Sequence, residues 1–72
     1  MPLIDIQIME GVFTEDEKAR MIEAVTRGFG SVAGNAMAEA TSTRIHEIKP
    51  GSWGYGGRVF SLSEAQAIKE RG

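Results

Sequence analysis

The sequence contains no cysteine, one histidine and two prolines among its 72 residues. The lack of cysteine excludes disulfide bonds and thiolate metal sites, and a single histidine cannot hold a structural zinc ion without unusual partners. A chain near this length buries only about 60% of its unfolded surface, so small domains usually need disulfides, a metal or oligomerisation. Because 42% of the residues are hydrophobic, we expect a single domain over residues 1–72 that associates with copies of itself.

Positive charge and long apolar runs are also scarce. The net charge is −2, and the eight basic residues are scattered, whereas a nucleic-acid-binding protein normally shows a basic stripe. No apolar run approaches the roughly 18 residues that span a membrane. The N-terminal segment carries Asp5 and has no basic flank, unlike a secretory signal. We therefore expect no nucleic-acid partner and no membrane association, and the lack of an export signal favours the cytoplasm.

The first segment predicts a half-buried strand. Over residues 3–9, Ile4, Ile6 and Ile8 fall on one face and the intervening residues on the other, a period of two. Pro2 suits the first position of such a strand, because it has no ladder hydrogen bond to lose there.

A helix is predicted next. Thr14 and Glu17 have the spacing of a capping box, and the first turn is acidic. The apolar residues that recur at spacings of three and four, and would cover a sheet, are Ile22, Val25, Phe29 and Val32. Gly34 is a plausible helix end, and residues 35–40 fit either a short helix or a loop.

Residues 41–49 are rich in β-branched types and predict a second strand. Its residues on one face are Ser42, Arg44, His46 and Ile48. Glycines around two aromatics in residues 53–60 predict a tight hairpin, and Ser63 with Gln66 predicts a terminal helix over 64–71. The fold class is α+β: a right-handed β-α-β unit with two parallel strands covered by one helix, a C-terminal hairpin, and assembly through the open sheet face.

This order of features resembles the short tautomerases of the 4-oxalocrotonate tautomerase type. The features that match run from Pro2 to Gly57: Pro2 after Met1, Glu10-Gly11 ending the first strand, an acidic helix start with Lys18, a second strand, and Trp53-Gly54-Tyr55-Gly56-Gly57. The resemblance implies a homohexamer built from dimers that join their sheets. It also implies isomerase chemistry on the enol forms of 2-keto acids, without a metal or cofactor, with Pro2 as the catalytic base once Met1 is removed.

The chemistry of a free N-terminal proline supports that role for Pro2. A secondary amine is more basic than neutral catalysis requires, and burial in an apolar pocket or a nearby cation lowers its pKa. Ile4 and Ile6 share the strand face of Pro2, and Trp53 or Phe60 from a neighbouring subunit would complete a dry pocket. The alternative is that a proline after Met1 has no special role.

Two positions depart from the family pattern. The resemblance places a carboxylate-binding arginine directly after Glu-Gly, where this sequence has Val12. It places a second arginine where counting back from Trp53 gives Ser42. Arg44 lies two residues along on the same strand face. We therefore expect Arg44, Trp53 and Ser42 to bind the small-molecule substrate, with Arg44 as a carboxylate clamp.

These assignments have alternatives. Arg44 would otherwise form an ion pair with Glu47 or Glu10, and Trp53 would serve as an interface anchor as well as a site wall. Arg58 is more typical of a solvated or interface residue. His46 is more typical of a hydrogen-bonded interface histidine than of a catalytic acid.

Three functions remain open. The first is a tautomerase with a preference for monoacids such as phenylpyruvate-like enols, because the carboxylate-binding arginines are incomplete. The second is another Pro2-dependent reaction, either imine chemistry with a carbonyl compound or hydration or dehalogenation of an unsaturated acid. The third is a non-catalytic partner subunit of a tautomerase-like hetero-oligomer, which a retained Met1 would favour because an amide nitrogen is not a base.

Overall fold

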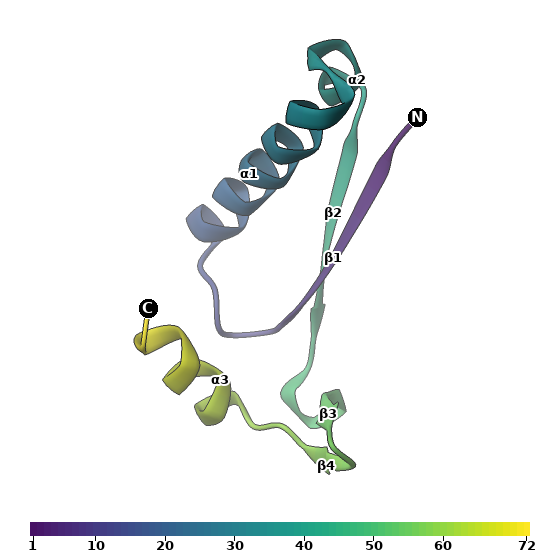
Figure 1. The fold of residues 1–72 in the computed structure, drawn as a ribbon. Helices are drawn as coiled ribbons and strands as arrows, with labels where there is room; N and C mark the ends of the chain where they lie inside the picture. The colour runs from purple at the N-terminus through teal and green to yellow at the C-terminus, as the bar shows by residue number, and fades with distance from the viewer.

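The computed structural model describes residues 1–72 and consists of a β-α-β unit followed by a small hairpin and a helix (Figure 1). Strands β1 (Leu3–Met9) and β2 (Ser42–Ile48) are parallel, with Leu3 beside Ser42 and Met9 beside Ile48. The connection between them passes through α1 (Glu15–Ala33) and the short α2 (Asn35–Glu39). The predicted pair of parallel strands with a crossover helix is confirmed.

The ends of α1 follow from local interactions. Thr14 Oγ1 accepts a hydrogen bond from the Glu17 backbone amide at 3.1 Å, and the Glu17 carboxylate accepts one from the Thr14 amide at 2.9 Å. This is the predicted capping box, which satisfies two amides that have no partner within the helix. At the other end Gly34 adopts a φ of 103°, a conformation that favours glycine, and stops the helix.

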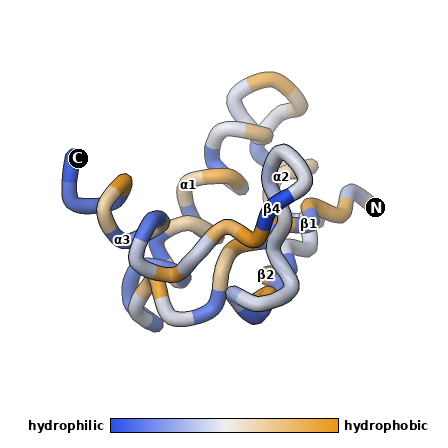
Figure 2. Tube along the Cα trace, turned by 90° about the horizontal axis from the view of Figure 1, so that it is seen from below, coloured by the Kyte–Doolittle hydropathy of each residue, from blue (hydrophilic) through white to orange (hydrophobic).

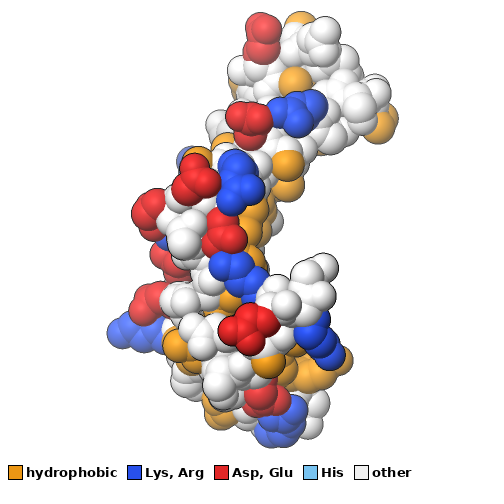
Figure 3. All heavy atoms as spheres, turned by 90° about the vertical axis from the view of Figure 1, so that its left-hand side faces the viewer, with side chains coloured by type: hydrophobic (Ala, Val, Ile, Leu, Met, Phe, Trp, Pro, Cys, Tyr) orange, Lys and Arg blue, Asp and Glu red, His pale blue; other side chains and the backbone are white.

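The outer face of α1 carries charges of alternating sign (Figure 3). Asp16 pairs with Arg20, and Glu23 pairs with Arg27, each at a separation of four residues. Such exposed pairs stabilise a helix by only about 0.2–0.5 kcal/mol each. The charged face therefore adds little to stability, and the opposite face determines where the helix packs.

That opposite face of α1 packs on one face of the two-stranded sheet. Thr26 Oγ1 lies 3.3 Å from Thr43 Oγ1, and Lys18 Nζ lies 3.0 Å from Glu47 Oε1. The residues of β1 on this face, Ile4, Ile6 and Ile8, are all half-buried. The expected apolar stripe is wrong at Val32, whose side chain is 92% exposed. Val32 lies in the last turn of α1, where the sheet does not cover the helix. Helical spacing predicts which face of a helix is apolar, but it does not predict how much of the helix length a sheet covers.

The segment after α1, which the sequence leaves open, forms α2 and folds back on α1. A Cβ atom added at Gly30 would lie 2.7 Å from the Cβ of Ala38. Because real Cβ atoms essentially never approach so closely, glycine at position 30 is what allows α2 to pack in this place.

The C-terminal part begins with a short 3₁₀ turn, η1 (Pro50–Ser52), and continues into the predicted hairpin. Strands β3 (Gly54–Tyr55) and β4 (Arg58–Val59) are antiparallel. The two residues between them, Gly56 and Gly57, have φ values of 61° and 84°, as a tight two-residue turn requires.

The terminal helix α3 (Leu62–Glu70) has a different cap from the one expected. Ser61, rather than Ser63, is the N-cap, and its capping-box partner is Glu64 rather than Gln66. Two overlapping serine patterns compete here. Ser61 has the extended backbone that an N-cap needs, and Glu64 is held by a further contact described below.

The chain has little core of its own. Only Met9 and Val12 are buried. The radius of gyration is 14.5 Å, whereas a compact chain of this length would have about 11 Å. The accessible surface is 5221 Å², compared with about 4,400 Å² for a typical folded monomer of this mass. Apolar segments are spread over the strands, α1 and the C-terminal part (Figure 2). None of the helices has the length and apolar character needed to cross a bilayer.

Candidate functional site

Pro2 lies at the end of the sheet where β1 and β2 both begin. The backbone amide of Ser42 donates a hydrogen bond to the carbonyl oxygen of Pro2 at 3.0 Å. Two of the residues predicted to form the site, Pro2 and Ser42, are therefore neighbours. Pro2 is half-buried, whereas Met1 before it is 94% exposed.

Arg44 lies on the open face of the sheet, opposite to α1. Its register partner is Asp5, and strand alternation places both residues on the face away from Pro2 and Ile4. Arg44 forms no ion pair and no side-chain hydrogen bond within the chain. The alternative pairing with Glu47 is not formed within the chain, because Glu47 pairs with Lys18. A single chain therefore leaves the Arg44 guanidinium free but directs it away from Pro2.

His46 occupies the same open face as Arg44. Its Nε2 atom lies 3.2 Å from Oδ1 of Asp5. Both side chains are about half exposed in the isolated chain. This contact supports the interpretation of His46 as a hydrogen-bonded residue of the open face.

Trp53 lies beyond the opposite end of the sheet, after Ile48 and η1. Since β1 has seven residues and a strand rises about 3.3 Å per residue, Pro2 and Trp53 are separated by about 20 Å along the sheet. Trp53 lines an apolar cavity of about 230 Å³ formed by the end of β1, the β1–α1 loop, the residues that flank the hairpin and α3. The residues that line it are Met9, Val12, Phe13, Trp53, Phe60, Ala65, Ile68 and Lys69.

Lys69 is the one charged residue of this cavity, and sequence reasoning missed it. Its Nζ atom donates to the carbonyl oxygen of Val12 at 3.0 Å and pairs with Glu17 at 2.6 Å. It also lies 5.2 Å from the ring centroid of Phe13, within range of a cation–π interaction. The hydrogen bond from Lys69, followed by that from the Thr14 amide, lowers the pKa of the Glu17 carboxyl. No local pattern around position 69 indicates these long-range contacts.

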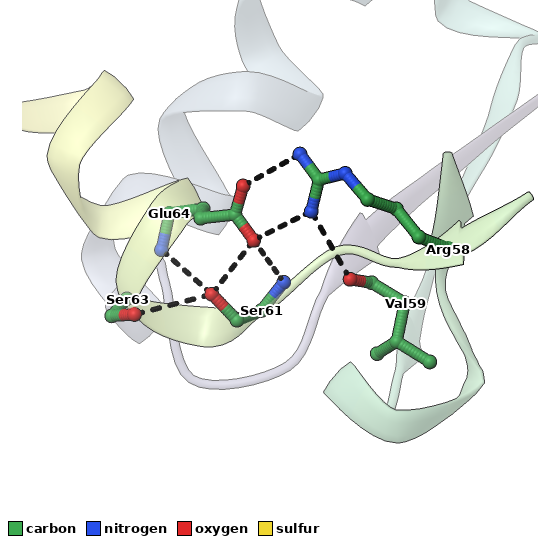
Figure 4. A network of polar contacts seen from close by, with 5 residues as sticks. All are labelled: Arg58, Val59, Ser61, Ser63 and Glu64. Atoms are coloured by element: carbon green, nitrogen blue, oxygen red, sulfur yellow. Dashed lines mark hydrogen bonds and ion pairs between the residues drawn. The ribbon is translucent and has the colours of Figure 1, made fainter. Parts of the chain in front are cut away.

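Arg58 connects the hairpin to α3 (Figure 4). Its two terminal nitrogens donate to the two carboxylate oxygens of Glu64 at 3.1 and 2.9 Å. Glu64 also accepts hydrogen bonds from the backbone amide and hydroxyl of Ser61. These contacts, with the Arg58 hydrogen bond as the largest, lower the pKa of Glu64 to about 2. Arg58 is thus paired with a carboxylate of its own chain. No group of three or more His, Cys, Asp or Glu side chains that could hold a metal ion occurs.

A family model described as tautomerase enzyme matches residues 2–63. One similar solved structure is that of the 4-oxalocrotonate tautomerase isozymes from Methylibium petroleiphilum, with 33% identity and a TM-score of 0.73, covering 81% of this chain and 90% of that one. Another is TomN, a 4-oxalocrotonate tautomerase homologue in the tomaymycin biosynthetic pathway, with 28% identity and a TM-score of 0.74, covering 99% of this chain and 97% of that one. No curated protein matches significantly.

Proposed function

The chain belongs to the tautomerase family, and we propose that it is a cofactor-independent tautomerase acting on enol forms of 2-keto acids, with Pro2 as the general base. The observation that carries this proposal is the position of Pro2. It stands at the start of β1, held against β2 by the Ser42 hydrogen bond, and the preceding residue, Met1, is exposed. Removal of Met1 would leave a secondary amine in a fixed position.

The proposed reaction is a proton transfer. In the enol-to-keto direction the Pro2 amine accepts the proton of the enol hydroxyl, and the resulting ammonium delivers a proton to the carbon of the former double bond. No electrons are exchanged with any other reagent. Negative charge develops on the enolate oxygen and remains on the carboxylate, so a positioned cation accelerates the reaction. Arg44, which has no partner in its own chain, is proposed as that cation.

We further propose that the site forms between subunits of a homo-oligomer, with a hexamer favoured. The separation of about 20 Å between Pro2 and Trp53 means that one chain cannot bring both to one substrate. Arg44 and Pro2 likewise point to opposite faces of the sheet. The small core and the large accessible surface support association, and the sheet face that α1 leaves open is the surface proposed for it. A neighbouring subunit would then supply Trp53 or Arg44 to each Pro2.

The first experiment combines intact mass with activity. Mass spectrometry measures the fraction of chains without Met1, and ketonisation of phenylenolpyruvate is followed for the wild type and for Pro2→Ala. We expect turnover to scale with the processed fraction and to fall by about 10²–10⁴ in Pro2→Ala, the usual contribution of a general base. Pro50→Ala, which changes the other proline of the chain, is the matched control and should remain active. No turnover by fully processed protein would refute the proposal.

A second candidate is favoured by the residues at positions 12 and 42. Val12 is buried and Ser42 is exposed, and neither can hold a carboxylate as an arginine does. A different Pro2-dependent reaction would fit such a site: imine formation with a carbonyl compound needs no carboxylate clamp, and hydration or dehalogenation of an unsaturated acid needs one cation, the role proposed for Arg44. Covalent trapping of an aldehyde on Pro2 by cyanoborohydride would identify the imine chemistry. A retained Met1 would instead favour a non-catalytic partner subunit.

A further inference from the structure

We propose that the apolar cavity beside α3 binds a small monocarboxylic acid with an aromatic or aliphatic side chain, and that Lys69 is the residue that selects the single carboxylate. The identification of this ligand with the substrate rests on the proposed function, but binding itself does not. Lys69 lies beyond residue 63, where the match to the family model ends.

The cavity has the size and walls for one small hydrophobic group. Its volume is about 230 Å³, below the roughly 300–1,000 Å³ of sites for drug-sized ligands. An apolar cavity of about 150 Å³ can hold benzene, so one ring with a short acid chain is an appropriate occupant. Trp53 and Phe60 form aromatic walls, and Met9, Val12 and Ile68 add aliphatic surface.

Lys69 is the only charged residue that lines the cavity, and its ammonium is shared with Glu17 at 2.6 Å. An ammonium has three N–H donors, and two are directed at Val12 and Glu17. The third donor makes no hydrogen bond within the chain, although the ammonium also lies 5.2 Å from the centroid of the Phe13 ring. The side chain is 36% exposed, so a ligand carboxylate can approach this donor. Because the other seven lining residues are hydrophobic, a second carboxylate would be buried without a partner. The cavity therefore favours monoacids over diacids.

The position of the ammonium is fixed by contacts at both ends of α3: those at the start hold the helix, and those at the end hold Lys69 itself. At the start of the helix, Glu64 binds Arg58 and caps the first turn at Ser61 (Figure 4). At its end, Lys69 contacts Val12 and Glu17, and Glu17 is itself fixed by the capping box of α1. A cation that is positioned before the ligand arrives binds an anion with a smaller loss of conformational entropy.

The test uses the single tryptophan as its reporter. Trp53 lines the cavity and is the only tryptophan of the chain, so its fluorescence should change when the site fills. The assembled protein is titrated with 3-phenylpropanoate, with its neutral amide and with the diacid glutarate. We expect the monoacid to bind about tenfold more tightly than the amide, the effect of one hydrogen bond to a charged group, and glutarate to bind most weakly.

Variants separate an anion-binding role from a purely structural one. Lys69→Met removes the charge and keeps an apolar stem, and it should weaken the monoacid about tenfold while leaving the amide unchanged. Lys69→Arg should retain the preference for the acid. Lys18→Met, which removes an ammonium that pairs with Glu15 and Glu47 elsewhere on the molecule, should behave as the wild type.

Equal binding of acid and amide to the wild type would overturn the proposal, as would equal weakening of both ligands in Lys69→Met. If Lys69→Met fails to assemble, Lys69→Gln, which lacks the charge but keeps a polar end, replaces it, and retention of the wild-type preference for the acid in that variant would overturn the proposal. Because these ligands are not turned over, an inactive protein that prefers the acid, and loses that preference in Lys69→Met, would refute the proposed function and retain this site.

Discussion

The ammonium of Lys69 lies 3.0 Å from the carbonyl oxygen of Val12, although the two residues are 57 positions apart. The side chain of Val12 is buried and offers no charge. A cation nevertheless reaches this part of the molecule, because the C-terminal helix returns to the loop that follows β1. The positive charge beside Val12 therefore comes from the way α3 folds back, and not from the residue at position 12.

The unpaired guanidinium of Arg44 leads to the first prediction. Arg44→Ala should lower kcat/KM for phenylenolpyruvate by about 10²–10³, the usual effect of removing a donor that stabilises a developing oxyanion. Arg20→Ala, which removes an exposed arginine paired with Asp16, is the control and should leave kcat/KM unchanged. An Arg44→Ala enzyme with wild-type kcat/KM would show that Arg44 does not serve the site.

The contact between α1 and α2 yields a pair of opposite predictions. Gly30→Ala should destabilise the protein by about 1–3 kcal/mol, since the new methyl group would meet Ala38 and overpack the contact. Gly28→Ala has nothing within 4 Å of the new methyl group, and it should stabilise the protein by up to about 1 kcal/mol through helix propensity. Urea unfolding monitored by circular dichroism measures both changes. Equal effects would contradict the close approach of α2.

The pair between Arg58 and Glu64 predicts a pH-dependent stability. The folded-state pKa of Glu64 is about 2, below its ordinary value of 4.5. The pair therefore stabilises the folded state above about pH 4.5, and this contribution is lost as the pH falls toward 2. Glu64→Gln retains a capping residue but lacks the charge. The difference in melting temperature between wild type and Glu64→Gln should shrink over that range.

Glu70→Gln provides the control for this measurement, because Glu70 lies on the same helix and forms no ion pair. Its melting temperature should follow that of the wild type at every pH. A difference between wild type and Glu64→Gln that is constant from pH 2 to 7 would show that the charge of Glu64 is not responsible.

The small core predicts that folding depends on association. Only two residues are buried in one chain, so the melting temperature should rise with protein concentration as for an obligate oligomer. Thermal unfolding over about a hundredfold range of concentration, with sedimentation velocity for the mass, tests this. Leu3→Asp, on the open sheet face, should dissociate the assembly, because a carboxylate buried at the interface would lack a partner. A monomer whose melting temperature does not depend on concentration would contradict this prediction.

Local rules predict much of the secondary structure correctly. The strand alternation of residues 3–9, the capping box at Thr14 and the helix end at Gly34 each depend on residues within a few positions of one another. The paired glycines of the hairpin are of the same kind. Where two local patterns overlap, the rules do not decide. The cap of α3 was expected at Ser63 and lies at Ser61, because Glu64 also binds Arg58.

The candidate site is only partly readable from the sequence. The resemblance to tautomerases identifies Pro2, Ser42, Arg44 and Trp53 as candidates, and the fold places Pro2 beside Ser42. The separation of Pro2 from Trp53 and the opposite orientation of Arg44 require the strand register. These relations depend on how the strands pair, and no pattern within a single segment contains them.

The amino-acid sequence alone determines most helices, strands and turns of this protein, because periodicity, caps and turn glycines act over a few residues. It also carries the pattern of residues by which the family is recognised. Tertiary structure decides which surfaces those elements share. It sets α1 on one face of the sheet and leaves Asp5 and Arg44 on the other. It also brings Lys69 to Val12 and Glu17. Contacts between such distant residues arise from the path of the whole chain, and the residues within any one segment do not predict them.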